Sequence, residues 1–179
     1  MKKYLIFFLV ISVVILSGCN KATENKGGES QNQEQKQEQT KKGDISDDVC
    51  AEFSAELVGN AMGKEVVKTE GPSMASFYNC RYYFNYDEKT KKGDNILLNL
   101  ENLDVARQKR GHEIMDRTIT TNDKIKMEHF MAMQEDGQIN SLYLVLGPNR
   151  FISINRSSFK AGTNEDIINL AEKLAEEIK

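Results

Sequence analysis

Two adjoining segments at the start of the chain restrict the part that can fold to residues 44–179. Lys2 and Lys3 are followed by thirteen mostly apolar residues at positions 4–16. As a helix this run is about 20 Å long, at about 1.5 Å per residue, which is too short for the roughly 30 Å hydrocarbon core of a bilayer. A basic start, a short apolar middle and small residues at the end are typical of a secretory signal peptide. Residues 1–18 are therefore predicted to be a leader that takes no part in the fold.

The apolar run ends in Leu16-Ser17-Gly18-Cys19, which resembles the lipobox of bacterial lipoproteins: a leucine, two small residues and a cysteine. The resemblance implies cleavage before Cys19, a diacylglycerol on its sulfur and an acyl chain such as palmitate on the new amino group. Two or three acyl chains anchor a protein stably, whereas a single chain is marginal. The implied location is the cell envelope, with the lipid in the outer face of the cytoplasmic membrane or in the outer membrane. The alternative is an ordinary signal peptide or anchor in which Cys19 has no role.

The segment after Cys19 has a very different composition. Residues 20–43 contain one small apolar residue, Ala22, and glutamine occupies every second position from Gln31 to Gln39. Such a segment has nothing to bury and cannot offset the entropy of ordering itself. Residues 19–43 are therefore predicted to be the lipidated cysteine and a disordered tether with a reach of about 25 to 30 Å. The alternative is a glutamine-rich interaction tract.

Residues 44–179 have the length of one domain with a single core. They contain 17 lysine and arginine residues and 23 aspartate and glutamate residues, which gives a formal charge of −6. This balance argues against nucleic-acid binding and against docking onto anionic lipid.

Hydrophobic periodicity in this region predicts three helices and six or seven strands. The helices are expected from Ser46 or Asp47 to Gly63, over residues 103–115, and from Thr163 or Asn164 to the end of the chain. The strands are expected over residues 64–70, 77–86, 95–101, 117–121, 126–134, 141–146 and 151–155. Strands in runs joined by short turns favour the α+β class. We predict a mainly antiparallel sheet of about six to seven strands with helices packed on one face.

Two cysteines in this region, Cys50 and Cys80, are both predicted to face the core. Cys50 shares a helix face with Phe53 and Leu57, and Cys80 lies on the apolar face of its aromatic strand. In an exported protein such a pair is most simply a disulfide that joins the first helix to the sheet. Two buried free thiols are the alternative. A redox or metal pair is disfavoured because no CxxC spacing occurs.

No motif of a known catalytic class is present: the chain has no GxSxG, P-loop, GxGxxG or HExxH. The protein is predicted not to be an enzyme and to need no cofactor. His112 and Asp116 have the i, i+4 spacing of a helical metal or acid–base pair, for which a solvated helix face is the alternative. A basic cluster in the same segment matches either an anionic ligand or a solvated face. It consists of Arg107, Lys109, Arg110 and Arg117.

The helix predicted over residues 103–115 has an apolar stripe. Leu103, Ala106, Ile114 and Met115 form the stripe, which is interrupted at positions 110 and 111.

One strand combines soft metal ligands. Met127, His129, Met131 and Met133 recur at every second position and share one strand face. Thioether and imidazole groups together suit Cu(I). The alternative is that the methionines fill the core and the histidine is hydrogen-bonded at its edge. In addition, same-face residues on a strand are about 6.5 to 7 Å apart, which is a wide spacing for ligands of a single metal ion.

The spacing of Cys50, Gly63 and Cys80 resembles that of small exported lipoproteins of unknown function with a PsbP/Mog1-like fold. The resemblance covers residues 49–84 and departs from the pattern where Arg81-Tyr82 stands in place of a tryptophan. It implies an antiparallel α+β fold and assigns no binding residues.

These features together predict a membrane-anchored extracytoplasmic lipoprotein with a non-enzymatic binding or accessory domain. Its expected partners are the membrane, through the lipid, and an envelope protein or small ligand, but not nucleic acid. The alternative function is a small-molecule or Cu(I) carrier that uses the methionine and histidine strand. An enclosed polar pocket would favour a carrier, whereas an exposed aromatic patch around Phe77 and Tyr83 would favour a protein partner.

Overall fold

A computed structural model of the chain describes residues 45–72 and 78–178. The predictions for the leader, for Cys19, for the tether and for Phe77 lie outside the described residues. Within these ranges, none of the helices has the length and apolar character needed to cross a membrane.

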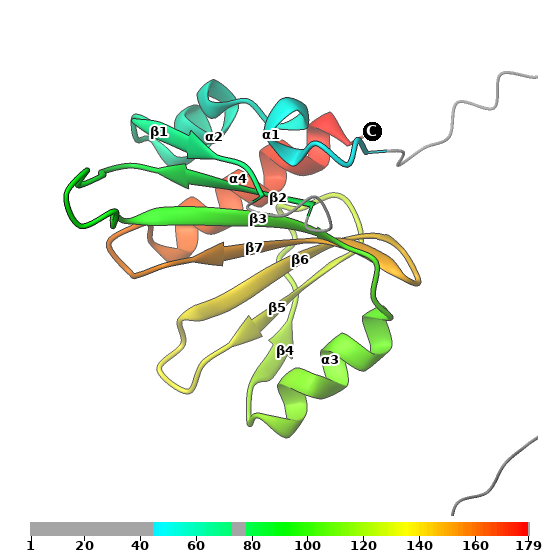
Figure 1. The fold of residues 1–179 in the computed structure, drawn as a ribbon. Helices are drawn as coiled ribbons and strands as arrows, with labels where there is room; N and C mark the ends of the chain where they lie inside the picture. Colours follow the sequence, from blue (N-terminus) through cyan, green and yellow to red (C-terminus); the bar gives the residue numbers. More distant parts are fainter. Residues whose placement is uncertain (1–44, 73–77, 179) are drawn as a thin grey trace, which may run out of the picture. The chain divides into compact units, whose positions relative to one another are not determined.

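Seven strands form one sheet in which every neighbouring pair is antiparallel (Figure 1). Their order across the sheet is β1-β2-β3-β7-β6-β5-β4. The strands are β1 (Lys68–Glu70), β2 (Tyr78–Tyr83), β3 (Asn95–Glu101), β4 (Thr118–Thr120), β5 (His129–Met133), β6 (Ile139–Gly147) and β7 (Arg150–Arg156). The helices are α1 (Val49–Glu52), α2 (Ala55–Met62), α3 (Val105–Ile114) and α4 (Asn164–Glu177). This arrangement confirms the predicted α+β class with an antiparallel sheet.

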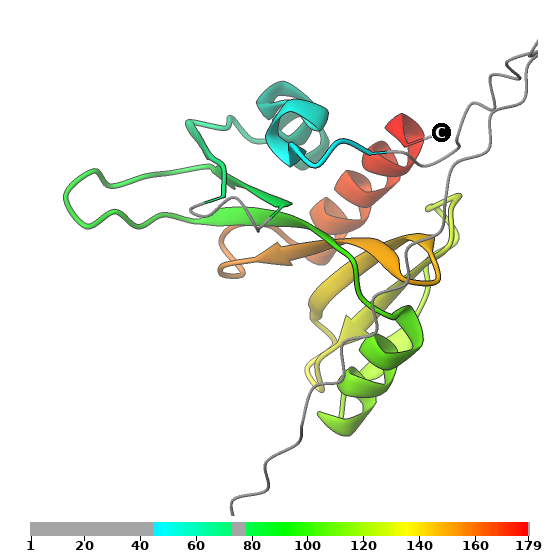
Figure 2. The ribbon, with the colours of Figure 1, turned by 45° about the vertical axis from the view of Figure 1, so that its right-hand side comes forward.

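The two faces of the sheet are covered differently. α1, α2 and α4 contribute to the larger apolar core on the first face, whereas α3 contributes to a smaller cluster on the second face (Figure 2). Strand alternation explains this division, because Leu142 and Leu144 of β6 point into the first core and Tyr143 between them points into the second.

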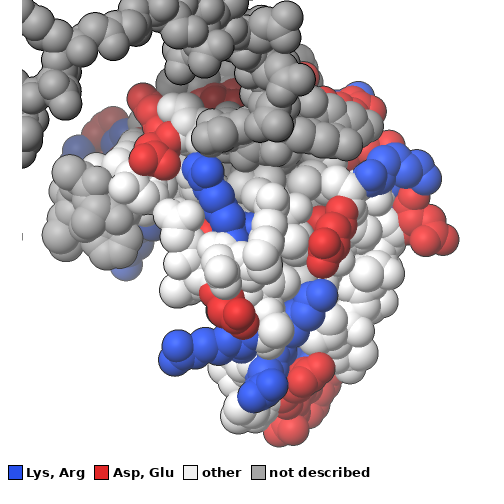
Figure 3. All heavy atoms as spheres, turned by 90° about the vertical axis from the view of Figure 1, so that its right-hand side faces the viewer, with Lys and Arg blue, Asp and Glu red and all other residues white. Residues whose placement is uncertain are grey.

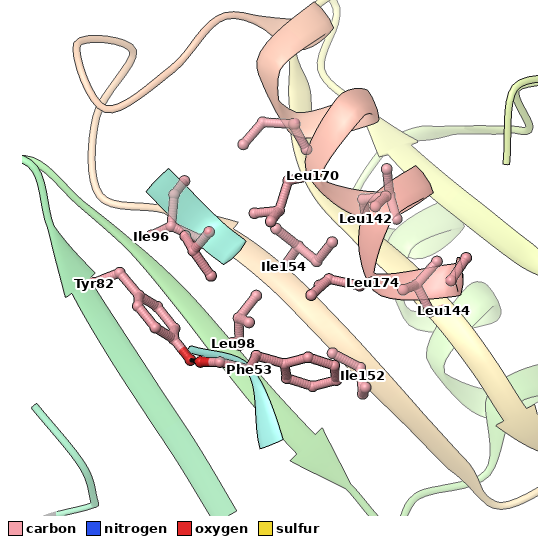
Figure 4. Close-up of a cluster of buried hydrophobic side chains, with 14 of the residues drawn as sticks. Phe53, Tyr82, Ile96, Leu98, Leu142, Leu144, Ile152, Ile154, Leu170 and Leu174 are labelled. Atoms are coloured by element: carbon pink, nitrogen blue, oxygen red, sulfur yellow. Dashed lines mark hydrogen bonds between the residues drawn. The ribbon is translucent and has the colours of Figure 1, made fainter. Parts of the chain in front are cut away.

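The larger core lies between the middle of the sheet and the helix layer. Figure 4 shows Leu170 and Leu174 of α4 packed over side chains of β6 and β7, with Phe53 and Tyr82 at the other end of the cluster. All four of these named side chains are fully buried. Burial of each large apolar side chain contributes about 1.5 to 3 kcal/mol, so this layer is the main source of stability.

The C-terminal helix begins at Thr163, one of the two predicted cap residues, with a complete capping box. The Thr163 hydroxyl accepts from the Asp166 amide, and the Asp166 carboxylate accepts from the Thr163 amide. The two contacts satisfy backbone N–H groups that would otherwise have no partner in the first turn.

The prediction of one continuous first helix is wrong, because the segment forms two helices, α1 and α2, with a break at Phe53. Phe53 has an extended backbone (φ −116°, ψ 101°) that turns its side chain into the core. The Tyr82 hydroxyl donates a 2.6 Å hydrogen bond to the Phe53 carbonyl, and Ser54 then caps α2 by accepting from the Leu57 amide. The predicted end of the segment is confirmed, since Gly63 has φ 60° after the last turn.

The predicted disulfide is confirmed. Cys50 of α1 is bonded to Cys80 of β2, with a Cα–Cα distance of 5.1 Å and a sequence separation of 30. Cys80 is fully buried. The bond and the Tyr82 hydrogen bond both join the short helix α1 to strand β2.

Candidate functional site

The second face of the sheet carries the most distinctive chemistry in the described residues. α3 covers the part of this face over β4, β5, most of β6 and the Phe151 end of β7, and no described helix covers the other half, over β2, β3, the rest of β7 and the adjoining Ser141 of β6. The covered half is apolar: Val105 of α3 packs with Phe130, Tyr143 and Phe151, and the rings of Phe130 and Tyr143 stack at a centroid distance of 4.4 Å. We take this face, with α3, as the candidate site.

α3 presents its apolar stripe to solvent rather than to the sheet. Leu103, Ile114 and Met115 are 51%, 77% and 53% exposed, while Val105 and His112 are the buried residues of the helix. Apolar periodicity alone would place this stripe against the core, so it is a poor guide to the orientation of α3. The physical reason is that the polar face of α3 finds hydrogen-bond partners on the sheet.

The buried imidazole of His112 is hydrogen-bonded on both sides. Arg117 Nη1 lies 3.0 Å from His112 Nδ1, and His112 Nε2 lies 2.6 Å from the hydroxyl of Tyr143. Arginine can only donate, so Nδ1 accepts and Nε2 carries the proton that is donated to Tyr143. Gln108 donates a second hydrogen bond, of 3.1 Å, to the same hydroxyl. Burial, followed by the charge of Arg117, lowers the pKa of His112, and burial raises the pKa of Tyr143.

This geometry separates the two members of the predicted helical metal or acid–base pair. His112 points into the sheet with both ring nitrogens engaged, whereas Asp116 is exposed beyond the end of α3 with φ 56°. Across residues 45–72 and 78–178, no group of three His, Cys, Asp or Glu side chains is arranged to hold a metal ion.

The open half of the face carries a hydrogen-bonded polar row. The row consists of Asn99 and Glu101 of β3, Ser153 and Asn155 of β7, and Ser141 of β6. Ser153 donates to the Glu101 carboxylate at 2.7 Å and accepts from the side-chain amides of Asn99 and Asn155 at 3.0 Å each. Ser141 donates to Asn155 at 2.7 Å.

The polar row combines buried and exposed groups. Ser153 and Ser141 are 1% and 4% exposed, while Asn99, Glu101 and Asn155 remain partly exposed. Ser153 pairs in register with Tyr143, so the row adjoins the hydrogen bonds under α3. Sequence reasoning missed this row. The polar alternation of β3 and of β7 was visible in the sequence, but the pairing of these two strands was not.

The predicted basic cluster is divided between the two sides of α3. Arg117 is bound to His112, and Lys109 lies over the ring of Phe130 at 5.0 Å. Arg107 and Arg110 are exposed on the outer side of the helix. The four residues therefore do not form one anion site.

The methionines and histidine of the predicted copper strand lie in or beside the larger core. Met131 is 4% exposed, and Met127 and Met133 pack against the same cluster. Met127 O accepts from His129 Nδ1 at 2.8 Å, and the Asn122 amide donates to His129 Nε2 at 2.8 Å. Both ring nitrogens are thus occupied, and no imidazole lone pair is left for a metal ion in this arrangement.

The aromatic residues at the β2 end of the sheet are tied to charged side chains. The Tyr83 hydroxyl donates to Glu70 at 2.9 Å, and Lys68 Nζ lies 3.6 Å from the ring centroid of Tyr86. Tyr83 is only 4% exposed, so it does not present an open aromatic surface.

The fold and this face define an α+β domain whose sheet is covered on one side and half open on the other. No protein-family model, no curated protein and no solved structure matches the chain.

Proposed function

We propose that the chain is an extracytoplasmic lipoprotein, acylated at Cys19, whose α+β domain is a non-enzymatic binding or accessory domain. The anchoring part of the proposal depends on the Leu16-Ser17-Gly18-Cys19 motif behind a basic and apolar leader. The Cys50–Cys80 disulfide is consistent with it, because structural disulfides persist in oxidising compartments.

The polar row is the observation that carries the binding part of the proposal. Its side chains are held in position by one another, so a partner that hydrogen-bonds to Asn99, Glu101 and Asn155 would lose little side-chain entropy on binding. Loss of such entropy commonly costs about 0.5 to 1.5 kcal/mol for each side chain that is immobilised. A preformed row of donors and acceptors is therefore suited to recognising a polar surface.

A binding role is favoured over catalysis by the state of the two histidines. His112 and His129 each have both ring nitrogens in hydrogen bonds, so neither is placed to exchange a proton with a substrate. The same contacts make a Cu(I) carrier a weaker alternative.

Two experiments test the two parts separately. For anchoring, mass spectrometry of the mature protein should find acyl chains on Cys19, and a Cys19→Ala variant should leave the membrane fraction.

For binding, a photo-cross-linking amino acid is placed at Leu97, which is half-buried on the open half, and at Glu56 on α2 as control. We expect a cross-linked adduct at position 97 and none at position 56. The yield at position 97 should fall in a variant with both Asn99→Ala and Asn155→Ala. Equal labelling at both positions would contradict a role for this face.

A further inference from the structure

The outer surface of α3 is unusual in this domain. Among the described residues five large apolar side chains are more than half exposed, and three of them, Leu103, Ile114 and Met115, lie on α3 or at its ends. An apolar cluster on one element marks an interaction surface more often than scattered single residues do.

Helix geometry places two arginines between these apolar residues. At about 100° per residue, the line of α3 opposite the buried Val105 and His112 runs through Arg107, Arg110 and Ile114, and Leu103, which precedes the N-cap, borders the same hollow. We call this line the outer line of α3. Neither Arg107 nor Arg110 has an ion-pair or side-chain hydrogen-bond partner in the part of the chain that the structure describes.

The outer line contains no carboxylate. The nearest acidic residue at the start of the helix, Asp104, uses its carboxylate to cap α3 by accepting from the Arg107 amide at 2.6 Å. Glu113 lies to the side of the line. Figure 3 faces this side of the molecule and shows Lys and Arg side chains projecting from uncharged surface in its lower part, with acidic side chains between and around them.

We propose that the outer line of α3 docks onto an anionic lipid surface. Leu103 and Ile114 enter the interface, and Arg107 and Arg110 bind lipid phosphates. The proposal rests on the anchoring proposed above, because the tether predicted from the sequence, with a reach of about 25 to 30 Å, would keep the domain beside its own membrane. At that effective concentration a weak docking interaction is sufficient.

A lipid surface fits this region better than a protein helix does. Among residues 45–72 and 78–178, the hollow on the outer side of α3 is lined only by residues of this helix and its N-terminal flank, so no second described element forms an opposite wall. A helix from a partner would be contacted along one side only, whereas a lipid surface needs no more than a projecting amphipathic face. The charge of −6 for residues 44–179 is not contradictory, because phosphate contact depends on the charges that reach the surface and distant charges are screened within about 10 Å.

The test uses the full acylated protein in vesicles and a fluorescent label on a single added cysteine. Ala106→Cys places the label beside the outer line without changing it, and Asn60→Cys places it on α2 as control. Vesicles contain phosphatidylglycerol with phosphatidylcholine, or phosphatidylcholine alone, and a fraction of lipids carries a headgroup nitroxide that quenches the label. Mass spectrometry confirms acylation of each sample.

Docking predicts stronger quenching at position 106 than at position 60 in anionic vesicles, and loss of this difference in neutral vesicles or at high salt. Arg107→Gln with Arg110→Gln should weaken docking by about twenty-five-fold, because each basic residue near an anionic surface contributes roughly five-fold. Lys89→Gln with Lys92→Gln removes the same charge from the β2–β3 loop and should leave the quenching at position 106 unchanged.

Equal quenching at positions 106 and 60 in the acylated protein overturns the docking proposal and leaves anchoring intact. Contact at position 106 that is found only in membranes containing native proteins, and not in pure lipid vesicles, also overturns the docking proposal. It assigns the surface to a protein partner. If Cys19 is not acylated, the anchoring proposal fails. The same quenching comparison, made with protein added to excess anionic vesicles, then decides whether α3 binds lipid.

Discussion

Arg117 donates a hydrogen bond of 3.0 Å to Nδ1 of His112, and this contact requires the buried imidazole to be neutral. A proton on Nδ1 would face a guanidinium donor at hydrogen-bond distance. The stability of the packing between α3 and the sheet therefore depends on the protonation of one side chain.

The first prediction concerns acid. Burial and Arg117 lower the pKa of His112 in the folded state below its ordinary value of about 6.5. The unfolded chain then binds more protons than the folded chain, so this stabilisation is complete above about pH 6.5 and is lost as the pH falls through the folded pKa. Chemical unfolding at several pH values should show a steeper loss of stability for the wild type than for His112→Gln. Parallel curves for the two proteins would rule out this role for His112.

The second prediction concerns Tyr143. Tyr143→Phe keeps the stacked ring on Phe130 but removes the acceptor for His112 Nε2 and Gln108. Leaving a buried donor without a partner costs about 1 to 3 kcal/mol, so the free energy of unfolding should fall by that amount.

The matched control is Tyr83→Phe, which removes a hydroxyl bound to the exposed Glu70 and should cost about 0.5 to 1.5 kcal/mol at most. Urea titration followed by circular dichroism measures both variants. A Tyr143→Phe protein no less stable than Tyr83→Phe would show that the bonds beneath α3 contribute little.

The third prediction concerns the disulfide. Replacing both Cys50 and Cys80 by alanine opens a loop of 30 residues and should lower the free energy of unfolding by about 3 to 4 kcal/mol in the chain-entropy model. Reduction of the wild-type protein should produce a similar loss, whereas the alanine variant should not respond to reductant. Unfolding midpoints that coincide with and without the bond would mean that α1 is held by its other contacts.

The fourth prediction concerns copper. Met131 packs in the core and His129 has no free ring nitrogen, so Met131→Leu with His129→Gln should leave the Cu(I) affinity unchanged in a competition titration against a coloured chelator. The wild-type protein and the variant are compared under identical reducing conditions. Weaker binding by the variant would instead support the copper-carrier alternative.

Local patterns were sufficient for several elements of the fold. The capped C-terminal helix, the helix end at Gly63 and the disulfide were predicted because each depends on spacing within one segment or on a pair of core-facing cysteines. The break at Phe53 was not predictable in the same way. Part of its stabilisation comes from Tyr82, 29 residues later, whose hydroxyl donates a hydrogen bond to the Phe53 carbonyl.

The orientation of α3 shows the limit of periodicity most clearly. Its apolar residues suggest one buried face, yet His112 and Gln108 face the sheet because Tyr143, on a strand more than 30 residues away in sequence, satisfies both of them. A polar residue can be buried when a partner is present, and the partner belongs to another element. The polar row depends on the same kind of relationship, since β3 and β7 become neighbours only in the folded sheet.

Alternation, helical period and cap residues act over short distances along the chain, so they were enough to predict the α+β class, the antiparallel sheet and the pairing of Cys50 with Cys80. The side of α3 that faces water and the polar side chains that meet on the open half of the sheet follow only from the folded structure. Both depend on hydrogen bonds and packing between strands and helices that are far apart in sequence, and those free energies exist only once the sheet order β3-β7-β6 has formed.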